Sequence, residues 1–95
     1  MQSAMCSVEG IIRGTDAPFA EIHGFQPEEL AGSPITAVIA PHCRDELPLH
    51  ILIACSRGTH DFPSVHRNRS GEEFPVQVAM RLESGRVRYE VRDPS

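Results

Sequence analysis

The sequence predicts an α+β fold in which helices cover one face of an antiparallel sheet. The chain of 95 residues has the length of a single domain. Apolar residues in its second half alternate with polar ones, as in half-buried strands, whereas residues 46–57 have the period of a helix. Gly and Pro residues stand singly between these stretches, which indicates one compact unit without a linker.

Two short strands and a helix are expected first. Residues 5–8 and 11–13 are the candidate strands, separated by a turn at Gly10. Asp16 is the candidate N-cap of the helix that follows, because its carboxylate can accept a hydrogen bond from a free backbone N–H group. Gly24 is the expected end of that helix.

Two more short helices and one longer helix should follow. Pro27 and Pro34 each stand after a polar residue, at the first helical position, where the missing amide hydrogen costs nothing. The longer helix is expected at about residues 46–57, with Asp45 as its cap and Gly58 just past its end.

The last third of the chain alternates with a period of two. A strand near residues 62–68 leads through a turn at 69–72 into residues 74–82, and a short turn then leads into residues 87–92. The three strands form an antiparallel meander, which brings the expected total to five.

Two dissimilar segments carry a family resemblance. Residues 22–32 (IHGFQPEELAG) are a Gly-aromatic step into a short helix, and residues 67–76 (RNRSGEEFPV) are a Gly turn into an alternating strand. In this order and spacing the pair resembles a PAS domain, the small sensory module of bacterial signalling proteins. Residues 10–12 (GII), 16–19 (DAPF) and 92–93 (RD) are similar to further landmarks of that family, although Asp16 replaces its more usual Asn.

The resemblance implies a PAS fold: a five-stranded antiparallel sheet with short helices and one longer helix on one face. We expect residues 1–95 to be a single PAS domain without the flanking N-terminal helix that is common in the family. Such a module passes its state to the output domain of a larger protein, for example a histidine kinase of a two-component system, a cyclic-dinucleotide enzyme or a transcription regulator.

Composition excludes several partners. The net charge is −4 and the nine basic residues, all Arg, are spread along the chain, which argues against nucleic-acid binding. The longest nearly apolar run, residues 47–55, is too short to span a membrane, so we expect no membrane contact by this segment. The three cysteines form no C-x-x-C pair, which favours reduced thiols and a cytoplasmic location.

The residues do not predict an enzyme. No serine lies in a G-x-S-x-G elbow. The five histidines and three cysteines match no zinc spacing, so we expect solvated or singly bonded histidines and small buried thiols, with no bound metal. An enzyme or a metal protein remains only a remote alternative.

The family forms a cavity between the sheet and its long helix, and a stripe at helical spacing faces it here. The residues expected to line this ligand pocket are Phe19, Leu47, His50, Ile51, Ala54, Val76, Val78 and Met80. A small apolar or amphipathic molecule would occupy the pocket. The alternative is a PAS domain whose own side chains fill that space, acting only in dimerisation and relay.

No cofactor is expected. In haem-binding sensors of this family the proximal histidine lies on the long helix, at a position that corresponds to Leu47, which is apolar. A shifted ligand at His50, one turn on, leaves a haem-binding gas or redox sensor open. The Asn-Cys-Arg-Phe signature of photosensory flavin domains is absent.

The opposite sheet face is the expected contact of a weak homodimer. Alternation directs a mixed-charge set of side chains away from the pocket. The candidate dimer residues are Gln77, Ala79, Arg81, Arg88 and Glu90.

Overall fold

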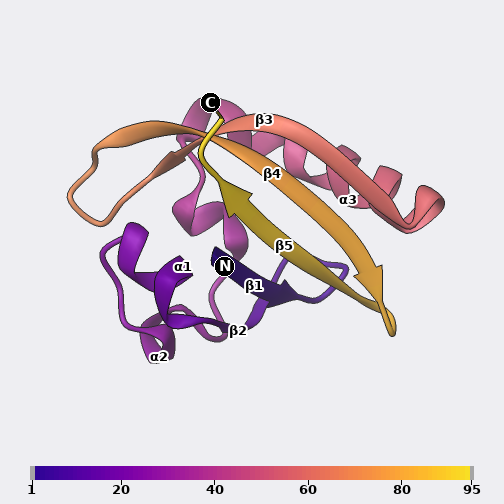
Figure 1. The fold of residues 1–95 in the computed structure, drawn as a ribbon, viewed down its shortest axis with the longest axis horizontal. Coiled ribbons are helices and arrows are strands. Elements are labelled where there is room, and N and C mark those ends of the chain that lie inside the picture. Colours follow the sequence, from indigo (N-terminus) through magenta and orange to yellow (C-terminus); the bar gives the residue numbers. More distant parts are fainter. Residues whose placement is uncertain (1, 95) are drawn as a thin grey trace.

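A computed structural model describes residues 2–94 (Figure 1). The elements in chain order are β1 (Gln2–Cys6), β2 (Ile12–Thr15), α1 (Ala17–Ile22), α2 (Pro27–Leu30), the 3₁₀ helices η1 (Ile35–Val38) and η2 (Pro41–Glu46), α3 (Leu47–Arg57), β3 (Thr59–Arg67), β4 (Glu73–Glu83) and β5 (Arg86–Arg92).

The five strands form one sheet in the order β2-β1-β5-β4-β3, and every neighbouring pair is antiparallel. The predicted meander of β3, β4 and β5 is therefore confirmed. Strand β5 lies at the centre, where Tyr89 is opposite Ala4 of β1 on one side and Met80 of β4 on the other.

The first two strands lie close to their predicted places. Strand β1 comes earlier than residues 5–8, because the amide of Gly10 donates to the carbonyl of Ser7 at 2.9 Å and closes a turn where the strand was expected to continue. Strand β3 likewise begins at Thr59, three residues before the predicted start.

Helix α1 begins as predicted. The carboxylate of Asp16 accepts a hydrogen bond from the amide of Phe19 at 2.9 Å, and it also accepts one from the amide of Ser3 at 3.1 Å. The cap therefore ties the helix to β1 as well as starting it. Gly24 follows the helix with φ of +79°, a conformation that favours glycine.

The predicted cap of the longest helix is wrong. Asp45 lies inside η2, and Glu46 is the first flanking residue of α3, with helical dihedral angles and no side-chain cap. The chain enters α3 directly from a 3₁₀ turn, so no extended residue is needed there. The other end agrees with the prediction, since Gly58 is left-handed with φ of +88°.

The two sheet faces differ as the alternation predicts. On β4, Val76, Val78 and Met80 are buried, whereas Gln77 and Ala79 between them are half-exposed. One apolar core lies between this inner face and the helices. No helix between residues 2 and 94 has both the length and the apolar character needed to cross a bilayer.

Candidate functional site

The residues predicted to line a pocket under α3 lie together in the core. Phe19, Leu47, Ile51, Ala54, Val76, Val78 and Met80 all belong to a single cluster of buried apolar side chains. Phe19, Ala54 and Val78 have no exposed surface at all. The structure thus gathers the predicted residues, and their own side chains pack the space between the helix and the sheet.

His50 is the exception, because it is only half-buried. Its ring lies against Phe62, and its Nδ1 is 2.9 Å from Nε2 of His60 on β3. Partial burial, with the nearby charge of His60, lowers the pKa of His50, and Glu46 opposes this shift. The imidazole therefore already has a hydrogen-bonding partner within the protein.

A hollow of about 510 Å³ lies at the opposite end of the inner face. Its lining comes from α1, from the loop between β3 and β4, and from the ends of β1, β4 and β5. The lining residues are Gln2, Ile22, Asn68, Phe74, Pro75, Val76, Val91, Arg92, Asp93 and Pro94. Of the eight predicted pocket residues, only Val76 is among them.

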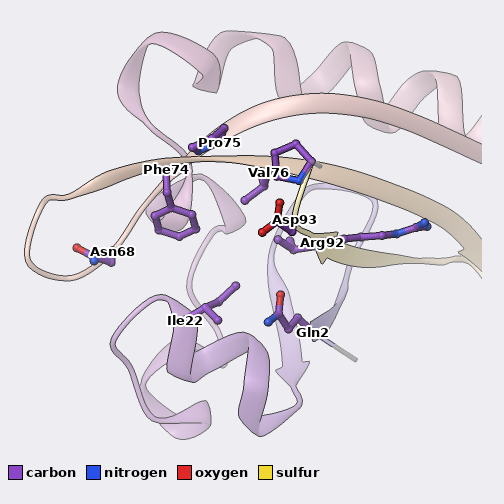
Figure 2. A pocket seen from close by; sticks show the side chains of 10 residues that line it. Gln2, Ile22, Asn68, Phe74, Pro75, Val76, Arg92 and Asp93 are labelled. Atoms are coloured by element: carbon purple, nitrogen blue, oxygen red, sulfur yellow. The ribbon is translucent and has the colours of Figure 1, made fainter.

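The walls of this hollow are apolar and its rim is polar. Figure 2 shows the side chain of Phe74 pointing from β4 toward Ile22 on α1, across the opening. Gln2 and Asn68 border the same space from β1 and from the β3–β4 loop, whereas the side chain of Arg92 extends away from it (Figure 2). Small-molecule sites of this size typically combine apolar walls with a few polar groups.

Beside the hollow, two histidines and a tyrosine form a buried hydrogen-bonded chain, here called the histidine chain. Nδ1 of His23 is 2.7 Å from the carbonyl oxygen of Phe19, and Nε2 of His23 is 2.8 Å from Nδ1 of His66. Nε2 of His66 is 2.9 Å from the hydroxyl of Tyr89. All three side chains are at most 1% exposed.

The direction of each hydrogen bond in the histidine chain follows from the group at one end, the carbonyl of Phe19. The carbonyl of Phe19 only accepts, so Nδ1 of His23 carries the proton and Nε2 accepts from Nδ1–H of His66. Nε2 of His66 is then left to accept from the hydroxyl of Tyr89. Every group is satisfied when both imidazoles are neutral and both are protonated at Nδ1.

Burial keeps the three side chains of the histidine chain uncharged. Removal from water lowers the pKa of His66 to about 3, with a smaller contribution from the charge of His23. It also lowers the pKa of His23, against the effect of the bond to the Phe19 carbonyl. Burial raises the pKa of the Tyr89 hydroxyl and that of the Cys6 thiol, the latter to about 12.

The sequence analysis did not predict the histidine chain. His23 and His66 are 43 residues apart, and His66 and Tyr89 are 23 apart. The expectation of solvated or singly bonded histidines is wrong for His23 and His66, each of which has two partners. One signal was present: alternation placed Tyr89 on the buried face, where a tyrosine hydroxyl needs a hydrogen-bond partner.

The candidate dimer residues lie on the outer sheet face. Gln77, Ala79, Arg88 and Glu90 are half-exposed and Arg81 is exposed. Ala79 on β4 stands between Asp61 of β3 and Glu90 of β5. Nε of Arg88 is 2.9 Å from a carboxylate oxygen of Glu83. The outer sheet face therefore carries positively and negatively charged side chains around the small apolar residue Ala79.

Residues 2–94 contain no group of three or more His, Cys, Asp or Glu side chains arranged to hold a metal ion. Cys6, Cys43 and Cys55 are free thiols.

Comparison by sequence finds no protein-family model and no curated protein that matches. Comparison by structure finds PAS domains. One, from Colwellia psychrerythraea, is 14% identical with a TM-score of 0.83, over 97% of this chain and 84% of that one. A domain of a sensory box sensor histidine kinase/response regulator from Geobacter sulfurreducens is 15% identical with a TM-score of 0.81, over 97% and 82% of the two chains.

A third neighbour is the PAS domain of a LuxR-family transcriptional regulator from Burkholderia thailandensis in complex with ethanol. It is 15% identical with a TM-score of 0.77, over 95% of this chain and 87% of that one. This chain therefore has the PAS fold, an α+β fold that occurs in histidine kinases and transcription regulators. The predicted fold is confirmed.

Proposed function

We propose that this chain is a sensory module of a signalling protein, which binds a small amphipathic molecule and relays its presence to an output domain. The observation that carries the proposal is the hollow lined by Ile22, Phe74 and Val76. The likeness in fold to domains of a sensor kinase and of a regulator supports the signalling role.

The hollow suits a molecule with an apolar body and one hydrogen-bonding group. Its apolar walls would cover the body, and the amide of Gln2 at the rim would bind the polar group. Because the hollow is open to one side, the ligand should keep its polar end toward water. The complex of a structural neighbour with ethanol shows that a domain of this fold can bind a small alcohol.

The position of the hollow also suggests how its state would be relayed. Gln2 on β1 and Asp93 after β5 both border it, and these strands are neighbours in the sheet. A bound molecule would change the contacts of both segments together. Signalling then follows if the two arrangements of these segments differ in their affinity for the molecule.

The second candidate is a PAS module that binds no ligand and acts in dimerisation and relay. The packed core between α3 and the sheet favours this alternative, since Leu47, Ile51 and Val78 occupy the space where a ligand was expected. Association through the outer face, around Ala79, belongs to either candidate. A cytoplasmic location is also part of the proposal, since three free thiols suit a reducing compartment.

Native mass spectrometry of freshly purified protein tests the proposal, with 1-hexanol added as a probe. We expect an additional mass that is retained on purification or acquired from 1-hexanol. In Gln2→Trp the indole should fill the hollow from its rim and abolish the additional mass. Leu52→Trp is the matched control, because it adds the same ring on an exposed position of α3. Protein that neither retains a compound nor binds the probe would favour the ligand-free candidate.

A further inference from the structure

The histidine chain joins the end of α1, where His23 is the C-cap, to strands β3 and β5 of the sheet. We propose that the chain of His23, His66 and Tyr89 is an acid-sensitive latch, which holds α1 and α2 against β3 and β5 and releases them when one of its imidazoles takes up a proton. This inference does not depend on a ligand in the hollow, because it concerns contacts that the protein makes with itself.

The latch lies where two separate parts of the fold close on each other. In Figure 1 the loop of the β3–β4 hairpin reaches over α1. The amide of Arg69 in that loop donates to the carbonyl of His23 at 2.8 Å. Its guanidinium forms an ion pair with Glu29 of α2 at 2.7 Å and lies 5.3 Å from the centre of the Phe25 ring. The ion pair is largely exposed and contributes little, so the polar ties beneath it are the backbone bond of Arg69 to His23 and the buried His23–His66 bond.

A single added proton disrupts the chain because all its bonds run in one direction. Protonation of His23 at Nε2 would place two N–H groups head to head at a spacing of 2.8 Å. Protonation of His66 at Nε2 would instead oppose the Tyr89 hydroxyl, which would have to rotate and find another acceptor. A buried imidazolium without a counter-charge is also costly, so release of α1 is the way for the charge to reach water.

The surrounding groups offer no such counter-charge. The titratable groups that face the histidine chain from the other packed elements are the thiols of Cys6 on β1 and Cys43 on η2. Both contribute to the raised pKa of Tyr89. Strand β4 presents the ring of Phe74, 5.7 Å from that of His23 and 6.3 Å from that of His66. Among the residues described, no carboxylate contributes to the pKa of either histidine.

The sign of the pH dependence follows from these neutral groups. In the closed latch the pKa of each imidazole lies below its ordinary value of about 6.5, and it returns to that value when the latch opens. The open form binds more protons, so acid favours opening. With the pKa of His66 at about 3 when closed, that residue alone should increase the opening constant about tenfold between pH 7.5 and 5.5.

The closed latch has a spectroscopic signature. In ¹⁵N-histidine spectra at pH 7.5, both His23 and His66 should carry the proton at Nδ1 and none at Nε2. This measurement uses the unaltered protein and so does not depend on any variant's folding. An Nε2-protonated form of either residue would overturn the direction of the chain and with it the latch.

Native-state hydrogen exchange tests the opening itself. At pH 5.5 the amides of Phe25 and Arg69 should open at least about tenfold more often than at pH 7.5, once intrinsic rates are removed. Their opening should depend little on urea, as a local event does, whereas the amide of Val78 in β4, an interior strand of the sheet, should show the full urea dependence of global unfolding. Equal urea dependence at all three amides at pH 5.5 would overturn the latch.

One variant separates the latch from general acid effects. His66→Gln removes a titrating group from the chain and should reduce the pH response at Phe25 and Arg69 by about tenfold. His42→Gln is the matched control, because His42 is exposed and is not part of the histidine chain. It should leave the response intact. An unchanged response in His66→Gln would contradict the proposal.

Discussion

The imidazole of His50 lies flat on the ring of Phe62, with the two centroids 3.6 Å apart and the planes only 2° from parallel. Its Nδ1 also meets Nε2 of His60 at 2.9 Å. These two contacts hold the residue that the sequence left as an alternative haem ligand.

The first prediction concerns haem. Haem bound through Nε2 of His50, the ring nitrogen that His60 does not contact, would have to displace the packed side chains of Leu47 and Ile51. Protein produced with added haem should therefore show no Soret band. A stoichiometric Soret absorbance that disappears in His50→Ala would contradict this.

A second prediction tests the strand register. Val78→Asp would bury a carboxylate at a position with no exposed surface and should cost several kcal/mol of the roughly 5 to 15 kcal/mol that stabilise a small domain. Gln77→Asp, on the outer face, should cost much less. Urea unfolding of both variants measures the difference, and equal losses would mean that the faces of β4 are assigned wrongly.

A third prediction concerns global stability in acid. Because burial lowers the pKa of both His23 and His66, the unfolded chain binds more protons than the folded one at pH values below about 6.5. The contribution of these two neutral imidazoles to the free energy of unfolding is complete above that pH and decreases as the pH falls. From pH 7.5 to 5.5 the free energy of unfolding should drop by about 1.4 kcal/mol for His66, and His23 and the half-buried His50, whose pKa values are also lowered, should add losses of the same sign.

Urea unfolding curves at the two pH values measure this drop. The control is His42→Gln, which should lose as much stability as the unaltered protein. A free energy of unfolding that stays constant over this range would show that the two imidazoles are not held neutral by burial.

The fourth prediction is a weak homodimer through the outer sheet face. Its charged residues, such as Arg81 and Glu90, surround Ala79, and exposed ion pairs contribute only about 0 to 1 kcal/mol each and are screened by salt. Light scattering should show a dimer that depends on concentration and dissociates with added salt or in Ala79→Glu. A monomer at high concentration, or a dimer insensitive to both changes, would exclude this face as the contact.

Local patterns predicted most of the fold because each depends on few residues. Alternation in β4 and β5 identified the inward-facing Val78 and Tyr89. Asp16 marks a helix start through its bond to an amide three residues on, and Gly58 marks a helix end through its left-handed backbone. The cap assigned to Asp45 is wrong because the preceding residues already follow a 3₁₀ helix, which no side-chain pattern distinguishes from a loop.

The candidate site could be predicted only in part. The helical stripe correctly brought Leu47 and Ile51 to the inner face, but whether that space is filled depends on the packing of several elements. The hollow and the histidine chain each join segments far apart in sequence, such as Ile22 with Phe74 and His23 with His66. No local period relates such residues, so only the folded chain brings them together.

The most direct test of ligand sensing is a methyl NMR titration with 1-hexanol. Binding in the hollow should shift the methyl signals of Ile22, Val76 and Val91, leave those of exposed Leu52 unchanged, and be lost in Gln2→Trp. Signals that do not move at any probe concentration, or shifts centred on Leu47 and Ile51 under α3, would contradict the account.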